Sequence, residues 1–391
     1  MPTPLAVDPD FADAARGGAR VLGLMSGTSL DGLDLCLARV THDRSLGQWS
    51  YELNAAETVP YDAAWRTRLE AAYELRGDAN GLSPKLAALD RDYGRYLGER
   101  AAEFLRRRRA RADLVASHGH TVHHRPAEGY TLQVGDGRQL AAACGLQVVA
   151  DFRTADVRAG GHGAPLVPLA DEILFGGYAQ CLNLGGFANV SYAASDGRRV
   201  AYDITAANGL LDRLSRRLGH DYDADGALAQ GGRIDRQLSD RLAGLAHYRL
   251  APPKSLGREW LEDSVWPLFG ADDVDARDAL ATATAHVAAE TARALAAGPP
   301  GEVLVTGGGA HNGFLVASIR ARLSATHRLT VPDRRLVDFK EALAFALLGA
   351  RRVRGEATAL ASVTGARRDT VGGVFAQAPS REENRDAVGG C

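Results

Sequence analysis

The chain has 391 residues, of which 46% are hydrophobic and 24% are charged, and it contains only 15 prolines. This composition indicates a globular protein of about two or three domains and excludes a largely disordered chain. The 46 basic and 48 acidic residues give a formal net charge of −2, which argues against a basic surface for nucleic acid. No apolar run has the length of a membrane span and no secretory leader is evident, so we expect a soluble, cytoplasmic protein.

Cysteine and lysine usage narrows the possible chemistry. The four cysteines are widely separated and form no CxxC pair, so we expect neither a disulfide framework nor a cysteine zinc site. Only three of the basic residues are lysines, Lys85, Lys254 and Lys340, a bias typical of an arginine-rich composition. None of them follows a glycine, so the chain has no phosphate loop of the Walker A type.

The first part of the chain predicts a meander of strands and then a long helix. Residues 1–19 are polar and without a period, so we expect a flexible extension there. The hydrophobic pattern predicts strands over 21–25, 33–37 and about 49–59, a helix over 83–109, and short strands over 113–117 and 147–150. A histidine-rich loop is expected after residue 117.

The second part repeats this order of elements. The pattern predicts strands over 180–184, 189–193, 199–204 and 302–305, and helices over 208–218, 277–297, from about 312, and over about 340–354. A meander with helices that occurs twice predicts an α/β protein of two lobes with a cleft between them. We expect lobe I over 20–145 with about 355–378, lobe II over 146–354, and a flexible tail over 379–391.

Two glycine-rich turns are candidate nucleotide-binding segments. In the turn after residue 26, backbone N–H groups and the hydroxyls of Thr28 and Ser29 can converge on phosphate oxygens, and Asp31 and Asp34 can hold Mg²⁺ directly or through water. The turn at 307–309 fails the GxGxxG pattern because Asn312 occupies the third glycine position, so it suits the sugar or base of a nucleotide better. An ordinary polar hairpin and a tight strand-to-helix turn are the alternatives.

Polar residues elsewhere suggest further chemistry. Four histidines fall within 118–124, which fits a zinc site, a substrate-facing loop or plain surface, although the helical HExxH spacing is absent. Asp151 follows a predicted strand and could act as a general base, or simply cap the next element. Glu341 opens a predicted helix, where its interaction with the helix dipole explains it without any function.

Taken together, these segments resemble the family of anhydro-N-acetylmuramic acid kinases over roughly residues 20–375. The matching blocks occur in the family's order and are long, so the resemblance is far more specific than one glycine loop. The blocks are GLMSGTSLDGLD (23–34), SHGHTVHHRP (117–126), TLQVGDG (131–137), VVADFR (148–153), GGHGAPLVP (160–168), LNLGGFANVS (182–191), PPKSLGREW (252–260), VTGGGAHN (305–312) and FKEALAFALLG (339–349).

The resemblance implies an actin/hexokinase-like fold, with two RNase-H-like lobes and ATP in the cleft between them. It also implies a reaction in which ATP and water convert 1,6-anhydro-N-acetylmuramic acid into N-acetylmuramic acid 6-phosphate and ADP. Such a reaction salvages cell-wall sugar that lytic transglycosylases release. Mg²⁺ as a cofactor, a small-molecule substrate and a homodimer are implied by the same resemblance.

The resemblance assigns roles to single residues. Asp151 matches the catalytic aspartate that takes a proton from the attacking water, and Glu341 matches an acidic residue that orients sugar and water. His118, Thr121 and Arg125 are expected to contact the sugar, with Arg125 suited to its lactyl carboxylate. The residues expected to bind ATP are Gly27, Thr28, Ser29, Leu30, Asp31, Gly32, Leu33 and Asp34 in a first phosphate loop, Asp203 and Asn208 in a second, and Gly307, Gly308 and Gly309 beside the adenosine.

The chain departs from the family pattern at two places. The second phosphate loop, commonly Asp-Thr-Gly-Pro-Gly-Asn, here reads Asp-Ile-Thr-Ala-Ala-Asn over 203–208 and lacks two glycines. This change leaves open a related phosphotransferase on another sugar, or a sugar- or nucleotide-binding regulator without turnover. His120 stands where many members have glutamine, which predicts an added pH dependence. Lys254 and Lys340 lie inside family blocks, so we hypothesise that arginine does not serve there.

Overall fold

The computed structural model describes residues 11–13, 17–27, 30–78, 81–270 and 274–377. The chain divides into two compact units: unit 1 comprises Met1–Leu174 and Glu341–Cys391, and unit 2 comprises Phe175–Lys340. Among the described residues, none of the helices combines the length and apolar character that crossing a membrane requires.

Unit 1 is built on a sheet of seven strands. These are β1 (Ala19–Ser26), β2 (Gly32–Asp43), β3 (Gln48–Pro60), β6 (Leu114–Arg125), β7 (Tyr130–Val134), β8 (Val148–Ala150) and β14 (Val374–Ala376). Their order is β14-β8-β6-β1-β2-β3, with β7 paired to β6. β1, β2 and β3 form an antiparallel meander, while β6 runs parallel to β1 and β8 runs parallel to β6. Three antiparallel strands followed by two parallel ones is the strand order of the RNase-H-like fold.

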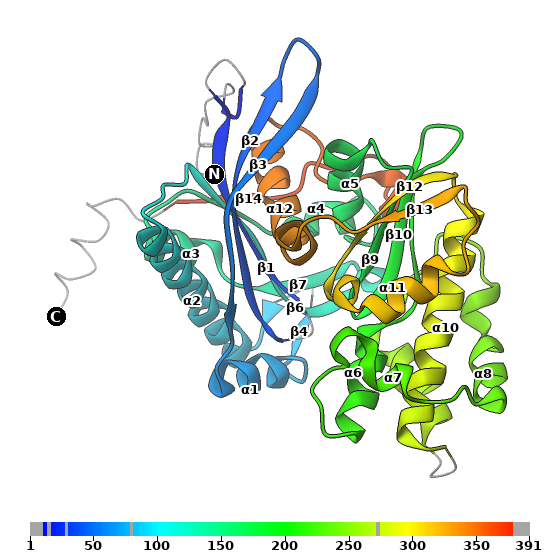
Figure 1. Ribbon diagram of the computed structural model, residues 1–391. Helices are drawn as coiled ribbons and strands as arrows, with labels where there is room; N and C mark the ends of the chain where they lie inside the picture. The colour runs from blue at the N-terminus through cyan, green and yellow to red at the C-terminus, as the bar shows by residue number, and fades with distance from the viewer. Residues whose placement is uncertain (1–10, 14–16, 28–29, 79–80, 271–273, 378–391) are drawn as a thin grey trace. The chain divides into compact units, whose positions relative to one another are not determined.

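Helices cover both faces of this sheet (Figure 1). The helices of unit 1 are α1 (Ala63–Ala72), α2 (Pro84–Arg108), α3 (Gly137–Cys144), α4 (Thr154–Arg158) and α13 (Ala361–Thr364), and a small hairpin is formed by β4 (Gly77–Asp78) and β5 (Gly81–Leu82). α5 (Val167–Phe175) ends just past the division between the units, and α12 (Arg334–Val353) contributes to unit 1 from Glu341 onward.

The sequence of α2 explains where this helix begins and which face it buries. The Ser83 hydroxyl accepts a hydrogen bond from the Leu86 backbone N–H, Pro84 occupies the first turn, and three arginines lie in the last turn. Apolar residues at helical spacing, including Tyr93 and Leu97, are fully buried with α3 against the sheet. On the other face α12 lies so close to β1 that any side chain at Gly23 would collide with the Ala342 carbonyl.

Unit 2 repeats the strand order of unit 1. Its strands are β9 (Gln180–Leu184), β10 (Phe187–Ala193), β11 (Arg199–Ala206), β12 (Gly301–Thr306) and β13 (His327–Thr330), in the order β11-β10-β9-β12-β13. β9, β10 and β11 form an antiparallel meander, and β12 and β13 run parallel to β9. The expected pair of RNase-H-like lobes is therefore confirmed, and two such units in one chain characterise the actin/hexokinase-like fold.

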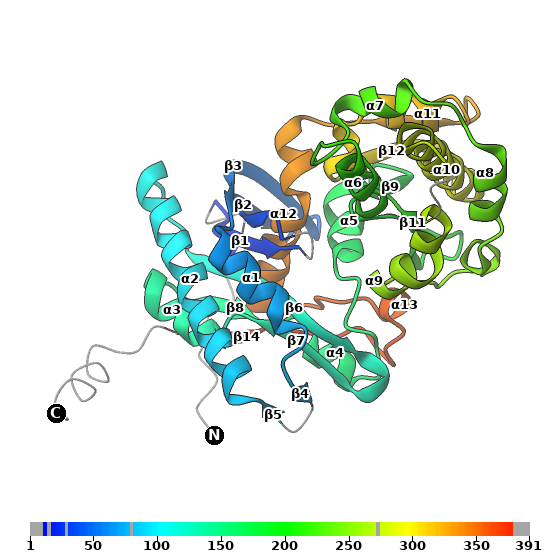
Figure 2. The ribbon, with the colours of Figure 1, turned by 90° about the horizontal axis from the view of Figure 1, so that it is seen from below.

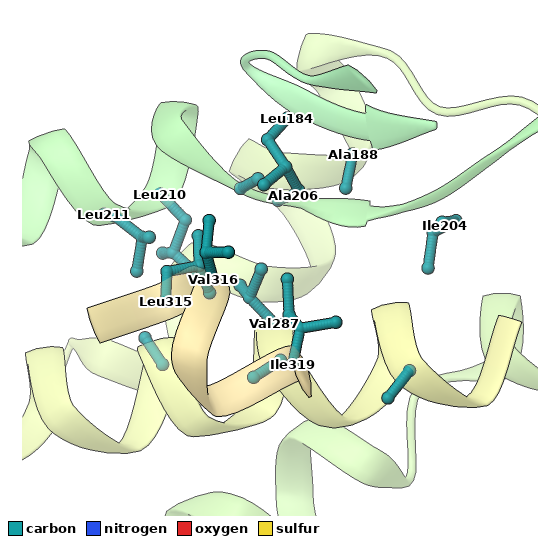
Figure 3. Close-up of a cluster of buried hydrophobic side chains, with 14 of the residues drawn as sticks. Leu184, Ala188, Ile204, Ala206, Leu210, Leu211, Val287, Leu315, Val316 and Ile319 are labelled. Atoms are coloured by element: carbon teal, nitrogen blue, oxygen red, sulfur yellow. The ribbon is translucent and has the colours of Figure 1, made fainter. Parts of the chain in front are cut away.

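Helices pack around α10 to form the core of unit 2. They are α6 (Asn208–Arg217), α7 (Ala227–Gln230), α8 (Arg236–Ala243), α9 (Arg258–Trp260), α10 (Ala276–Ala297) and α11 (Gly313–Arg320). α6, α7, α8 and α11 all contact α10 (Figure 2). Figure 3 shows Val287 of α10 and Leu315 and Ile319 of α11 beneath Leu184 and Ile204 of the sheet, and all five side chains are buried.

The division between the units differs from the boundaries expected at 145/146 and 354/355. β8 belongs to unit 1 because it pairs with both β6 and β14 in the first sheet. Phe345 of α12 also belongs to unit 1, where its ring lies 4.8 Å from that of His118 and 5.5 Å from that of Phe152. Asp151 and Glu341 therefore lie in the same unit as the first glycine-rich hairpin.

Three local expectations also differ from the structure. Part of the expected N-terminal extension is packed, because Asp13 is buried and forms an isolated parallel β-bridge with His42. Residues 1–10 and 14–16 and the expected tail 379–391 lie outside the described residues. The expected histidine-rich loop is the second half of β6, which pairs with β7. The last long helix begins before residue 340 because the Asp333 carboxylate accepts from the backbone N–H groups of Arg335 and Leu336.

Candidate active site

In unit 1 the ends of three neighbouring strands bring together most of the residues singled out in the sequence. Ser26 ends β1 and pairs in register with His120 of β6, while Ala116 of β6 pairs with Val149 near the end of β8. Asp151 follows immediately. Because β1, β6 and β8 are parallel, the first hairpin, the 118–120 segment and Asp151 share one edge of the sheet, the edge where α/β proteins place ligands.

Asp151 occupies an unusual backbone conformation at this edge. Its φ of 56° lies in the left-handed region, which residues other than glycine seldom adopt and which often marks a functional position. Its Oδ1 accepts a hydrogen bond of 3.0 Å from the backbone N–H of Thr154, the first residue of α4. The side chain therefore does cap an element, as the simpler interpretation expected, and this contact orients the carboxylate through one of its two oxygens.

Arg153 joins this group, although sequence reasoning gave it no role. Its Nη2 donates to Nε2 of His118 at 2.9 Å, and Nδ1 of His118 donates to the Gly119 carbonyl at 3.0 Å. Burial, together with the positive charge of Arg153, holds the pKa of His118 well below its usual value, so the imidazole is neutral. Burial lowers the pKa of Arg153 to about 10, and the charge of Glu341 opposes this change.

This electrostatic pairing links Arg153 to the predicted residue Glu341. At neutral pH the guanidinium is charged, and its Nε is buried without a partner among the described residues. The signal that could have found Arg153 is its place two residues after Asp151 in a long family block. The edge of unit 1 therefore combines two carboxylates, a buried cation and a neutral histidine.

The other two residues expected to contact the sugar behave differently. Thr121 lies on β6, and its hydroxyl oxygen is buried with no hydrogen-bond partner in the described part of the chain. An unpaired buried hydroxyl calls for a partner such as water or a ligand. Arg125, at the end of β6, is about half exposed and forms an ion pair with Glu128 at 3.8 Å. This ion pair is local, because Glu128 lies only three residues further along the chain.

The first glycine-rich hairpin is a tight turn. The Leu30 N–H donates to the Gly27 carbonyl at 3.3 Å, and Leu30 has a φ of 58°. The side chains of Leu30 and Leu33 are buried in the core, so only their backbone groups, with Gly27 and Gly32, can face a ligand. Thr28 and Ser29 lie outside the described residues.

The two aspartates of this hairpin differ in their surroundings. Asp31 is exposed, whereas Oδ1 of Asp34 accepts a hydrogen bond of 2.5 Å from the Thr58 hydroxyl. Within the described residues, no group of three or more histidine, cysteine, aspartate or glutamate side chains is arranged to hold a metal ion. Asp31 is therefore the better candidate for a water-mediated cation contact.

In unit 2 the turn at 307–309, which is predicted to lie beside the adenosine, approaches Asn208 next to the last residue of β9, Leu184. Gly307 has a φ of 82°, and a Cβ there would lie 2.5 Å from Oδ1 of Asn183. A Cβ at Gly309 would lie 2.9 Å from Oδ1 of Asn208, whose Nδ2 donates to the Leu184 carbonyl at 3.1 Å. Gly308 follows Gly307 in the same turn. The glycines thus allow two turns from distant parts of the sequence to approach closely.

The 203–208 segment, expected to be the second phosphate loop, is packed and hydrogen-bonded within unit 2. Ile204, Ala206 and Ala207 are buried in the core, so the alanines act as packing residues. The N–H groups of Ala207 and Asn208 donate to the carbonyls of Gly186 and Gly185 at 2.9 and 3.1 Å. These two amides are already engaged, which leaves the loop fewer donors for phosphate than a free glycine-rich turn has.

Asp203 and Lys254 stabilise this region from the side of β11. Oδ2 of Asp203 accepts from the Leu256 N–H at 2.8 Å, and burial raises the pKa of Asp203 to about 6. Nζ of Lys254 donates to the His247 carbonyl at 3.1 Å and lies 5.8 Å from the centre of the Tyr202 ring. Asp203 thus binds the 254–256 segment, whereas the Asn208 side chain binds the Leu184 carbonyl.

Comparison with known proteins identifies the family to which this chain belongs. The family model of anhydro-N-acetylmuramic acid kinases matches residues 19–378. The anhydro-N-acetylmuramic acid kinase of Rhodospirillum rubrum is 39% identical over 92% of this chain and 94% of its own, and that of Rhizorhabdus wittichii is 37% identical over 90% and 97%. Among solved structures, the activator of the 2-hydroxyisocaproyl-CoA dehydratase from Clostridium difficile with bound ADPNP is 14% identical over 86% of this chain and 96% of its own, with a TM-score of 0.43. That likeness is too distant to add to the assignment, which rests on the sequence relatives. The chain belongs to the family of anhydro-N-acetylmuramic acid kinases.

Proposed function

We propose that the protein uses ATP and water to convert 1,6-anhydro-N-acetylmuramic acid into N-acetylmuramic acid 6-phosphate and ADP. The observation that carries this proposal is the family match over nearly the whole chain, which includes both Asp151 and Glu341. The placement of these two residues in one unit, together with the charge coupling between Arg153 and Glu341, supports a single reaction site.

The chemistry requires a base, an electrophilic phosphorus and a released hydroxyl. We assign Asp151 as the base: its carboxylate, oriented by the Thr154 N–H, takes a proton from a water molecule that attacks C1. The bond between C1 and O6 breaks, and O6 attacks the γ-phosphorus of ATP with ADP as the leaving group. Glu341 and Arg153 would orient the sugar and balance the charge that develops beside the base.

Binding of ATP follows from the two glycine-rich turns. The 27–34 hairpin would contact the phosphates through backbone N–H groups, and Asn208 with Gly307, Gly308 and Gly309 would lie beside the adenosine. The exposed Asp31 fits a Mg²⁺ ion held through water, since Mg²⁺ usually takes one or two carboxylates and the phosphates themselves. The ion would neutralise charge on the transferring phosphoryl group.

The cellular location and the assembly of the protein can be proposed on similar grounds. Among the described residues, Cys36, Cys144 and Cys181 form no disulfide, which fits a reducing compartment, and ATP is a cytoplasmic substrate. We therefore place the enzyme in the cytoplasm, acting on a small molecule and not on nucleic acid. A homodimer follows from the family resemblance.

The test is a product assay with a matched variant. Purified protein is incubated with ATP, Mg²⁺ and 1,6-anhydro-N-acetylmuramic acid, and a 6-phosphorylated sugar is sought by mass spectrometry. The Asp151→Asn variant should bind ATP with unchanged affinity and lose on the order of 10²–10⁴-fold in turnover. A folded, ATP-binding wild-type protein that forms no phosphorylated sugar would refute the proposal, and a near-wild-type rate for Asp151→Asn would remove this residue from the role of base.

A further inference from the structure

A series of hydrogen bonds within unit 1 passes through Ser26, the residue that precedes the first phosphate hairpin. The hydroxyls of Tyr93 and Tyr61 lie 2.5 Å apart, and Tyr61 donates to Oγ of Ser26 at 2.7 Å. Oγ of Ser26 lies 2.9 Å from Nδ1 of His120, whose Nε2 lies 3.2 Å from the hydroxyl of Tyr73. The five side chains come from five separate segments, so the chain is a product of the fold and not of one local motif.

The donors in this chain can be assigned by counting protons. Each hydroxyl has one proton, and because Tyr61 donates to Ser26, Tyr93 must donate to Tyr61. A neutral His120 leaves two arrangements. Either Ser26 donates to Nδ1 and Nε2 donates to Tyr73, or Tyr73 donates to Nε2 and Nδ1 donates to Ser26. In the second arrangement the Ser26 hydroxyl keeps its own proton for another acceptor.

Burial keeps the side chains of this hydrogen-bond series uncharged. It lowers the pKa of His120 to about 4 and raises the pKa of Tyr61 to about 12, so neither group changes its charge between pH 5 and pH 8. His120 and Ser26 are almost completely inaccessible to solvent. The pH dependence expected from a histidine at this position is therefore not what the structure indicates. A neutral imidazole has a donor at one nitrogen and an acceptor at the other, and a glutamine side chain can supply both kinds of group.

We propose that His120 is a positioning residue for the phosphotransfer reaction, which it serves by fixing the Ser26 side chain and, through it, the start of the 27–34 hairpin. Ser26 is the last residue of β1 and pairs in register with His120, so a change in this hydrogen bond acts directly on the first residues of the hairpin. Tyr61 and Tyr73 hold the two ends of the Ser26–His120 pair. This inference rests on the proposed function of the enzyme.

Substitutions at His120 and Tyr61 test the positioning role. His120→Gln preserves one donor and one acceptor and should retain most of the wild-type kcat, whereas His120→Leu should lose on the order of 10²-fold in kcat with a smaller change in KM. Tyr61→Phe removes only the hydroxyl that donates to Ser26 and should lower kcat in the same direction. Tyr96→Phe is its matched control, since the Tyr96 ring lies 6.1 Å from that of Tyr61, while in the described part of the protein the Tyr96 hydroxyl forms no hydrogen bond with these five side chains.

The outcomes separate this inference from the proposed function. Equal kcat values for folded His120→Leu, Tyr61→Phe and wild type would overturn the positioning role while leaving the kinase reaction standing. A pH profile of kcat that loses a limb in His120→Gln would also overturn it, because it would show that His120 titrates in the working range. Histidine ¹⁵N shifts, assigned to His120 by their loss in His120→Gln, should show a neutral ring from pH 5 to pH 8 even if no sugar is phosphorylated. A charged ring in that range would contradict the hydrogen-bond chain, and absence of any sugar product would refute the proposed function.

Discussion

Replacing Asp203 by asparagine should stabilise the protein at neutral pH. Asp203 lies on β11, and its Oδ2 accepts a hydrogen bond of 2.8 Å from the Leu256 N–H. The amide oxygen of asparagine can accept the same hydrogen bond without a charge. The substitution therefore keeps the contact that holds the 254–256 segment and removes the cost of a partly buried carboxylate.

The magnitude follows from the pKa of Asp203. Burial raises it from 3.8 to about 6, so the folded protein binds this proton more tightly than the unfolded chain does. The wild type should therefore lose up to about 3 kcal/mol of stability as the pH rises from about 4 through about 6. Asp203→Asn lacks this loss, so its advantage should be near zero at pH 4 and reach its maximum at pH 7 to 8.

Calorimetric unfolding across this pH range measures the difference. Asp196→Asn provides the control in the same unit, because Asp196 is exposed and accepts hydrogen bonds from Arg198, which lower its pKa. The control should gain no stability above pH 6. An Asp203→Asn variant whose advantage over wild type does not grow between pH 4 and pH 7 would refute the argument that the folded state holds Asp203 at a raised pKa.

Three further substitutions test the site. Arg153→Gln removes the cation coupled to Glu341 and should lower kcat/KM by on the order of 10²-fold in the product assay; an unchanged value would leave Arg153 a purely structural role. Lys254→Arg should lose more activity than Lys85→Arg, since Lys254 is packed and Lys85 is exposed, and equal effects would contradict this. Gly309→Ala should weaken ATP binding in a calorimetric titration, and unchanged affinity would separate this turn from the nucleotide.

Local patterns predicted the regular elements of both units well. The alternation of Leu33, Leu35 and Leu37 with more polar neighbours corresponds to β2, and the helix expected over 83–109 is α2. These elements carry their own signals, because the period of apolar residues and the capping residues lie within the element itself. The strands expected over 180–184 and 199–204 are β9 and β11 for the same reason.

Those local patterns could not predict which strands from distant parts of the sequence pair with one another. The 118–124 segment is polar enough to be expected as a loop, yet His118 and His120 are buried in a strand that pairs with β1 and β7. The boundary between the units was misplaced because β8 is held in the first sheet by β14, which lies more than two hundred residues later in the chain. Arg153 received no role because its coupling to Glu341 also joins two segments that lie far apart in the sequence.

The family resemblance carried the site prediction further than local patterns could. Asp151, His118 and the first hairpin share one sheet edge, which no spacing rule alone would have established. The roles of Asp151, Glu341 and the sugar-binding residues remain predictions, because they concern contacts with molecules that the chain binds. What the structure adds is their physical setting: the Thr154 N–H orients the Asp151 carboxylate, and the charge of Glu341 is coupled to the buried Arg153.

The fate of water oxygen tests the central claim most directly. The reaction is run to completion in ¹⁸O-labelled water with ATP, Mg²⁺ and 1,6-anhydro-N-acetylmuramic acid, and the product is analysed at once by fragmentation mass spectrometry. We predict one phosphorylated sugar for each ADP, with the label on the C1 hydroxyl and none in the phosphate. A label in the phosphate, or ADP formed without a phosphorylated sugar, would contradict the mechanism in which Asp151 directs water to C1 and O6 accepts the phosphoryl group.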